Sequence, residues 1–159
     1  MATRGRIGMV MEDGKVASIY QHWDSYPSCL GATLLENYKD KAKVEKLIAL
    51  GDCSSVRAEV DIPEGKIHTF DNPLTNVTVA YGRDRGETEI EPRLDDSEDA
   101  FWKSDIEEYG YLFKDGKWYV ATSHGYEDAN GNYVPSARSA RKAVELTEDV
   151  IENEDAVLH

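Results

Sequence analysis

The stretch RIGMVMEDGKVASIY, residues 6–20, decides the fold, because it predicts a β-hairpin. Apolar residues alternate with small or polar ones along its two arms, which is the pattern of half-buried strands. Between the arms lies Asp13-Gly14, a pair that readily adopts the positive φ angles of a tight turn. A second hairpin is predicted over residues 111–120, around Asp115-Gly116. The two hairpins indicate an antiparallel sheet.

Helical spacing of apolar residues predicts helices between and after the hairpins. They cover residues 30–38, residues 40–50 with Asp40 as N-cap and Gly51 as C-cap, residues 97–108 with Ser97 as N-cap, and residues 136–152. Strands are predicted at residues 66–70 and at residues 77–81.

The predicted fold class is therefore α+β. We expect an antiparallel sheet of about five strands built from the two Asp-Gly hairpins, with helices on one side. An extra amphipathic helix follows near the C-terminus. Residues 1–122 are expected to form one compact domain. Residues 123–159 are expected to form a turn-rich segment and an acidic helix that packs on the domain or projects from it.

Composition excludes several classes of protein. The 159 residues carry a formal net charge of -13, which argues against direct binding to nucleic acid phosphates. No apolar run approaches the roughly 20 residues of a membrane span, and the N-terminus lacks a signal sequence. Two cysteines, Cys29 and Cys53, are too few for a disulfide framework. We expect a cytoplasmic protein with reduced thiols.

Four arginines form the first candidate site. Arg4 and Arg6 share a face of the first strand, and Arg83 and Arg85 follow a later strand. If these strands are neighbours, four guanidinium groups converge on one anion site, because the planar fork of arginine suits phosphate and carboxylate. The alternative is that Arg83 and Arg85 pair with acidic residues beside them in the sequence.

An aromatic loop directly after the first hairpin is the second candidate site. It contains His22, Trp23, Asp24 and Tyr26. Trp23 or Tyr26 could stack on a base, while His22 and Asp24 could form hydrogen bonds to it. The alternative is that Trp23 fills the core and His22 caps the strand.

Acidic residues of the last predicted helix form the third candidate, a surface for a basic partner. Glu145, Glu148 and Glu152 recur every three to four residues, about 5 Å apart along a helix, and Asp149 adds a fourth carboxylate. The spacing is of the same order as the ~3.4 Å between phosphates on one DNA strand. Such a face could occupy a basic cleft that normally holds DNA. A solvated helix face is the alternative.

Catalytic motifs are not evident. Cys29, Cys53, His22, His68 and His124 could in principle build a nucleophile–base pair or a metal site. Neither His-x-x-x-His nor Cys-x-x-Cys spacing occurs, and no glycine-rich phosphate loop is present. We therefore expect no catalytic residues, no metal and no cofactor. A nucleotide hydrolase centred on His22 and Asp24 stays as a last alternative.

Five motifs occur in a fixed order along residues 1–122. They are TRGRIG at 3–8, HWDSYP at 22–27, LIALGD at 47–52, RDRGE at 83–87 and SDIEEYGYLF at 104–113. As a set they resemble a family of small phage and prophage proteins that has no established activity. Residues 123–159 look like an extension. The resemblance implies an accessory phage protein that acts in the cytoplasm of an infected bacterial host cell, where such proteins often counter host defences.

The predicted function is a non-enzymatic counter-defence module that sequesters a small anionic, nucleotide-like ligand. The ligand would lie among the four arginines and the aromatic loop. An acidic nucleic-acid mimic that binds a basic host protein is the alternative. We expect no membrane partner, and the aromatic hairpins could bury the interface of a homo-oligomer.

Overall fold

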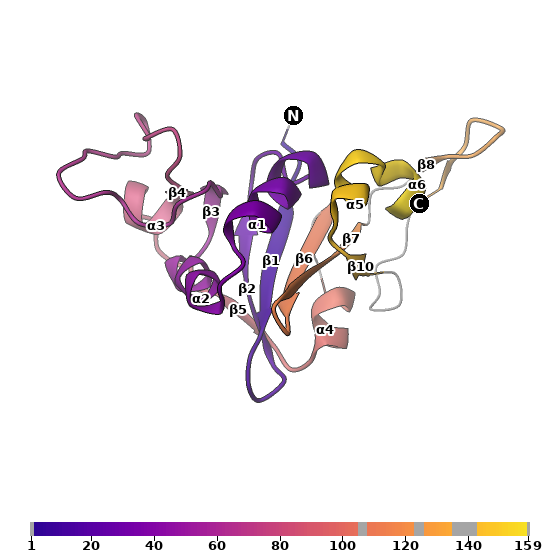
Figure 1. Cartoon of the computed structure of the whole chain (residues 1–159), viewed down its shortest axis with the longest axis horizontal. Coiled ribbons are helices and arrows are strands. Elements are labelled where there is room, and N and C mark those ends of the chain that lie inside the picture. The colour runs from indigo at the N-terminus through magenta and orange to yellow at the C-terminus, as the bar shows by residue number, and fades with distance from the viewer. Residues whose placement is uncertain (1, 105–107, 123–125, 135–142, 159) are drawn as a thin grey trace.

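The computed structural model describes residues 2–104, 108–122, 126–134 and 143–158. These residues form an eight-stranded sheet and a separate two-stranded ladder (Figure 1). The strands are β1 (Gly5–Val10), β2 (Val16–Gln21), β3 (Cys53–Ser55), β4 (Val79–Ala80), β5 (Arg93–Asp95), β6 (Tyr109–Lys114), β7 (Lys117–Thr122), β8 (Tyr126–Glu127), β9 (Tyr133–Val134) and β10 (Val144–Glu145). The helices are η1 (Pro27–Gly31), a π-helix, α1 (Ala32–Asn37), α2 (Lys41–Leu50), α3 (Tyr81–Arg85), α4 (Glu98–Lys103), α5 (Glu148–Glu152) and α6 (Glu154–Leu158).

Both predicted hairpins are present. β1 pairs antiparallel with β2, and β6 pairs antiparallel with β7. Their turns use positive φ angles, 85° at Gly14 and 51° and 78° at Asp115 and Gly116. The α2 helix also begins and ends as expected, since Asp40 accepts a hydrogen bond from the N–H of Ala42 and Gly51 has a φ of 88°. The α+β class is confirmed.

The sheet is larger than expected, and it is mixed. Its strand order is β10-β7-β6-β1-β2-β3-β4, and β5 pairs with β2. The β1 strand runs parallel to β6, and β2 runs parallel to β3. The outer edge of β2 is shared, because β3 pairs near Gln21 and β5 pairs at residues 16–18. Strands of two or three residues carry too little alternation to be predicted from sequence.

Helices cover both faces of the sheet, so the expectation of helices on one side is wrong. In Figure 1, α1, α2 and α5 lie in front of the sheet and α4 lies behind it. The front core includes Ile7, Tyr111 and Val120, whereas Phe101 and Trp102 of α4 pack on Leu112 behind. The reason lies in β6, where residues 109–113 are all buried. A strand without a polar face needs cover on both sides.

The C-terminal segment differs from the predicted continuous helix. Residues 135–142 lie outside the described part of the chain, and Val144–Glu145 form β10, which pairs with β7. The next residue, Leu146, is buried and donates its N–H to the carbonyl of Trp118. A helix begins only after Thr147, whose hydroxyl accepts from the N–H of Val150. Pairing with β7 and burial of Leu146 override the local helical pattern.

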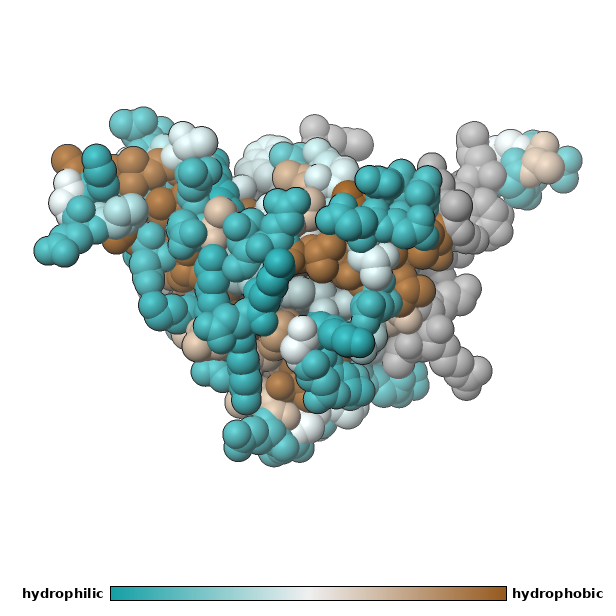
Figure 2. Space-filling model, viewed as in Figure 1, coloured by the Kyte–Doolittle hydropathy of each residue, from teal (hydrophilic) through white to brown (hydrophobic). Residues whose placement is uncertain are grey.

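Residues 56–78 form a long connection between β3 and β4. The strand considered at residues 66–70 is not formed. Instead His68 is buried and Ile67 is exposed. Figure 2 shows hydrophobic side chains gathered on this part of the molecule, at the upper left. No helix within the described residues has the length and apolar character needed to cross a bilayer.

Candidate functional site

The four predicted arginines do not converge. Arg6 lies on β1, whereas Arg83 and Arg85 lie on α3, directly after β4. In the sheet, β2 and β3 separate β1 from β4. At about 4.8 Å per strand the two strands are roughly 14 Å apart. The condition for convergence, neighbouring strands, is therefore not met.

Arg83 and Arg85 make local contacts, as the alternative interpretation held. Arg83 donates to the carbonyl oxygens of Val60 and Thr78, both at 2.6 Å, and to Oδ1 of Asp84 at 2.8 Å. Arg85 pairs with Glu87 at 2.8 Å. Its guanidinium carbon also lies 4.3 Å from the ring centre of Phe70 and 4.9 Å from that of Tyr81. These contacts hold the segment around α3 in place, and they use the guanidinium groups that we expected to bind an anion.

Arg6, on β1, and Arg4, directly before β1, also make contacts within the protein. Nη1 of Arg6 donates to the hydroxyl of Ser18 at 3.0 Å. Burial raises the pKa of Asp52 above its ordinary value, while the N–H of Tyr20 and the charge of Arg6 oppose that rise. Arg4 is exposed, and its backbone carbonyl accepts from the N–H of Tyr109.

The aromatic loop is a surface feature. Trp23 is 46 % exposed, so the alternative that it fills the core is wrong, and Tyr26 is also exposed. Nδ1 of His22 lies 2.7 Å from the hydroxyl of Tyr20, and its ring meets the Trp23 ring edge-on at 4.7 Å. Asp24 has a φ of 53°, and its charge raises the pKa of Tyr26. The predicted residues of this loop do lie together.

A buried glutamine anchors this loop. Nε2 of Gln21 donates to the carbonyl of Trp23 at 2.9 Å and to the hydroxyl of Ser25 at 2.7 Å. Its Oε1 accepts from the N–H of Val56 at 2.7 Å. The hydroxyl of Tyr111 donates to the carbonyl of Ser25 at 2.7 Å. Since Gln21 and Ser25 are buried, these bonds hold the exposed loop in one shape.

Arg57 is a residue that the sequence did not single out. Its N–H donates to the hydroxyl of Thr78 at 3.0 Å, and the hydroxyl of Tyr38 donates to its carbonyl at 2.6 Å. Burial raises the pKa of Tyr38 to about 12, so this hydroxyl stays protonated and can donate. The side chain is half-buried, and its Nη1 donates to the carbonyl of Leu74 at 3.0 Å.

The loop and Arg57 line one hollow of about 280 Å³. Its lining consists of Trp23, Asp24, Ser54, Ser55, Arg57, Phe70, Pro73 and Val79. Residues with aromatic, guanidinium, hydroxyl and carboxylate side chains thus line a space that is near the lower end, about 300 Å³, of the volumes of ligand pockets. Arg57 supplies a guanidinium group beside Trp23, where we expected Arg83 and Arg85. Its neighbours in sequence show no pattern, so only the tertiary structure brings it to Trp23.

His22 and Asp24 are the centre of the alternative hydrolase hypothesis. Within the described residues, Nδ1 of His22 contacts the hydroxyl of Tyr20, and the ring makes no hydrogen bond to Asp24. His68 does contact Asp84, but both ring nitrogens are engaged and both side chains are buried. Within the described residues, no group of three or more His, Cys, Asp or Glu could hold a metal ion. Cys29 and Cys53 are free thiols, and His124 lies outside the described residues.

The acidic surface is divided between two elements. Glu145 lies on β10 and pairs with Lys117 at 3.2 Å. Glu148, Asp149 and Glu152 lie on the short helix α5. The four carboxylates therefore do not follow one helix face at phosphate-like spacing.

Comparison with known proteins gives no assignment. No protein-family model, no curated protein and no solved structure matches the chain. The residues and their geometry are therefore the basis for inferring a function.

Proposed function

We propose that the protein is a binding module for a small, planar, anionic ligand of the nucleotide class. The ligand would occupy the hollow lined by Trp23, Arg57 and Phe70. One observation carries the proposal. Buried Gln21 joins the backbone of Trp23 to that of Val56, the residue before Arg57, so the two backbone segments that carry an exposed indole and a guanidinium group are held beside one hollow. Rigid placement of exposed groups lowers the entropic cost of binding.

The lining suits the parts of a nucleotide. An indole stacks on a base with about 1–3 kcal/mol of binding free energy. Within the described residues, Arg57 bonds to protein carbonyls through Nη1 alone, which leaves Nε and Nη2 for a phosphate. The hydroxyl of Ser55 and the carboxylate of Asp24 line the same space and can bind polar edges of the base or sugar.

Sequestration is the use that this arrangement supports best. Holding a ligand requires no nucleophile and no metal. The resemblance to phage proteins suggests a setting, in which the ligand is a nucleotide signal of a host defence. We propose this setting together with the binding activity, and the ligand test below addresses the binding directly.

The test is a titration followed by tryptophan fluorescence. Trp23 is the exposed one of three tryptophans, because Trp102 and Trp118 are buried, so quenching on binding reports on the hollow. We expect cyclic and linear nucleotides to quench emission with micromolar dissociation constants. Matched nucleosides and ribose 5-phosphate should bind at least tenfold more weakly. Absence of binding by all nucleotides at millimolar concentration would refute the proposal.

Two variants locate the site, with calorimetry as the readout. Trp23→Ala and Arg57→Gln should each weaken nucleotide binding about fivefold or more, since each removes about 1–3 kcal/mol. Arg57→Lys keeps the charge and should restore only part of the affinity. Arg4→Gln removes one exposed cation outside the hollow and should leave the affinity unchanged. Equal losses in Arg4→Gln and Arg57→Gln would indicate a general charge effect.

A further inference from the structure

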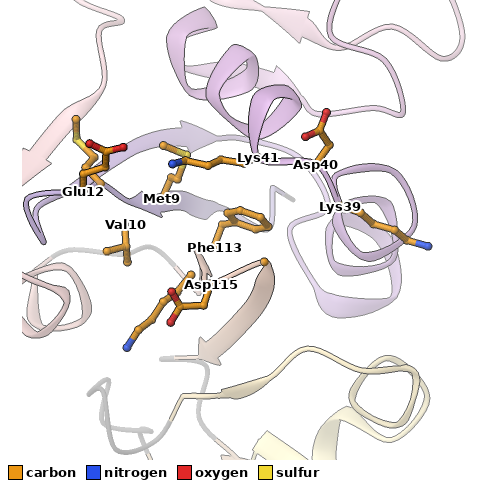
Figure 3. A pocket seen from close by; sticks show the side chains of 11 residues that line it. Met9, Val10, Glu12, Lys39, Asp40, Lys41, Phe113 and Asp115 are labelled. Atoms are coloured by element: carbon orange, nitrogen blue, oxygen red, sulfur yellow. The ribbon is translucent and has the colours of Figure 1, made fainter.

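A second, larger concavity lies at the turn end of the two hairpins. It consists of two adjoining pockets of about 540 and 480 Å³, which share Met9, Met11, Glu12 and Lys41 (Figure 3). We call their combined lining the hairpin groove. It comprises Met9, Val10, Met11, Glu12, Asp13, Lys39, Asp40, Lys41, Glu45, Phe113, Lys114, Asp115 and Gly116. None of these residues lines the hollow beside Trp23.

The floor of the hairpin groove is apolar and adaptable. Met9 and Phe113 belong to the front core and reach the groove from neighbouring strands β1 and β6. Figure 3 shows Met9, Lys41 and Phe113 at its centre. Met11 is 39 % exposed. Methionine has three rotatable bonds and a polarisable sulfur, so it adjusts to partners of different shape.

The rim favours a positively charged partner. Lys41 and Lys114 line the groove, but each is compensated, by Glu45 at 4.0 Å and by Glu98 at 3.1 Å. Lys39 is exposed, and Figure 3 shows it pointing away from the space between Met9 and Phe113.

Carboxylates make the rim of the hairpin groove negatively charged. Glu12 and Asp13 follow β1 at the first hairpin turn and are exposed. Among the described residues, neither has a lysine or arginine side chain within ion-pair distance. Asp115 adds a third carboxylate from the second turn. A net charge of -13 on the whole chain strengthens the attraction for a cationic partner at long range.

We propose that the hairpin groove docks a basic amphipathic segment of another protein. An apolar side chain of that segment would contact Met9, Met11 and Phe113, and its lysines or arginines would face Glu12, Asp13 and Asp115. A second copy of this chain fits less well, because two molecules of charge -13 repel each other. The hairpin groove shares no residue with the proposed nucleotide hollow. An experiment can therefore refute one proposal without refuting the other.

Methionine methyl NMR tests the docking site directly. The chain has three methionines, and two of them, Met9 and Met11, line the groove. The probe is a synthetic amphipathic peptide of leucine and lysine, 14 residues long. We expect saturable shifts of the Met9 and Met11 methyl signals, assigned through Met9→Leu and Met11→Leu. Trp23 emission should stay constant. Absence of any shift at millimolar peptide would overturn the proposal.

Matched peptides and variants separate docking from simple charge attraction. Replacing the leucines with serine, or the lysines with glutamate, should weaken binding at least tenfold. Glu12→Lys and Met11→Lys in the protein should also weaken peptide binding at least tenfold, with the Met9 signal as the readout. Leu94→Lys, at a 57 % exposed position on β5 outside the groove, is the control and should bind as the native chain does.

Two outcomes contradict the proposal. If the serine peptide binds as tightly as the leucine peptide, the interaction is charge attraction alone. If the Met9 and Met11 signals shift with protein concentration in the absence of peptide, the groove is an interface between copies of this chain. Binding that weakens between 0.05 and 0.3 M salt, yet still depends on the leucines, supports the proposed docking.

Discussion

Nε2 of His68 lies 3.1 Å from Oδ2 of Asp84, and both side chains are at most 1 % exposed. The N–H of Leu74 donates to Nδ1 of His68, so Nε2 carries the proton and donates to the carboxylate. Asp84 also accepts from the N–H of Ala80 at 2.8 Å and from Arg83. This carboxylate therefore fastens the long connection to α3, and that connection supplies Phe70 and Pro73 to the hollow.

Removing this carboxylate should destabilise the fold strongly. Asp84→Ala leaves the buried ring of His68 and the N–H of Ala80 without their acceptor, and it removes one of the three acceptors of Arg83. We expect the free energy of unfolding to fall by about 3 kcal/mol. Glu87→Ala, which breaks the exposed pair with Arg85, should change it by no more than about 0.5 kcal/mol. Urea unfolding of both variants gives the comparison, and similar small effects would contradict the structural role of Asp84.

The ionisation of Asp84 should make the free energy of unfolding depend on pH in acid. Burial alone would raise the pKa of Asp84, but hydrogen bonds from Arg83 and Ala80 outweigh it and lower the pKa below 3.8. The ionised group therefore stabilises the fold fully above pH 3.8, and this contribution is lost as pH falls through the lowered pKa. The difference in stability between the native chain and Asp84→Asn should shrink below pH 3.8. A constant difference down to pH 2.5 would contradict it.

The pH dependence of stability that Asp52 contributes should have the opposite sign to that of Asp84. Its pKa is raised above 3.8 because burial disfavours the charged form. The fold therefore loses stability as pH rises from 3.8 through the raised pKa, and the loss persists above it. Asp52→Asn does not titrate, and its carbonyl can still accept from the N–H of Tyr20. We expect this variant to gain stability relative to the native chain across that window. Urea unfolding between pH 3 and 7 measures the gain.

Features set by neighbouring residues could be predicted from the sequence. The turns at Asp13-Gly14 and Asp115-Gly116 need only the φ angles of two residues each. The start of α4 is equally local, because the hydroxyl of Ser97 accepts from the N–H of Ala100. A loop at Trp23 could also be predicted, since it follows directly from the first hairpin, but its exposure could not, because the sequence also allowed Trp23 to fill the core.

Features set by distant residues could not be predicted. The two residues of β10 become a strand only by pairing with Val120 and Tyr119. Arg57 reaches the hollow because Tyr38 and Thr78, 19 and 21 residues away, hold its backbone. Arg83 does not approach Arg6 because β2 and β3 lie between their elements, and the carbonyl groups of Val60 and Thr78, 23 and 5 residues away, accept hydrogen bonds from Arg83. No pattern along the chain encodes these contacts.

Gln21 offers a test of the preorganised hollow. Gln21→Leu keeps the volume roughly but leaves the carbonyl of Trp23, the hydroxyl of Ser25 and the N–H of Val56 without their partner. Each unsatisfied buried group costs about 1–3 kcal/mol, so we expect a clear loss of unfolding free energy. Nucleotide affinity should fall as well, although the variant leaves Trp23 and Arg57 in place. Ser28→Ala, at an exposed position on η1, is the control for both measurements.

The C-terminal segment should contribute to the stability of the whole fold. Leu146 is 2 % exposed and packs in the front core. Leu146→Ala should therefore lower the free energy of unfolding by about 3 kcal/mol, through lost burial and a residual cavity. Glu148→Ala, two residues later and exposed, should change it by less than about 0.5 kcal/mol. A small effect of Leu146→Ala would mean that the segment docks only loosely.

The position of β1 between β2 and β6 has a consequence for how the protein is made. A ribosome releases the first hairpin early, but the neighbour on the other side of β1 begins only at Tyr109. Until then a nascent chain carries an open strand edge, with Ile7 lacking its cover from the later strands. Translation products that stop before this point should be substrates for chaperones and proteases rather than folded fragments.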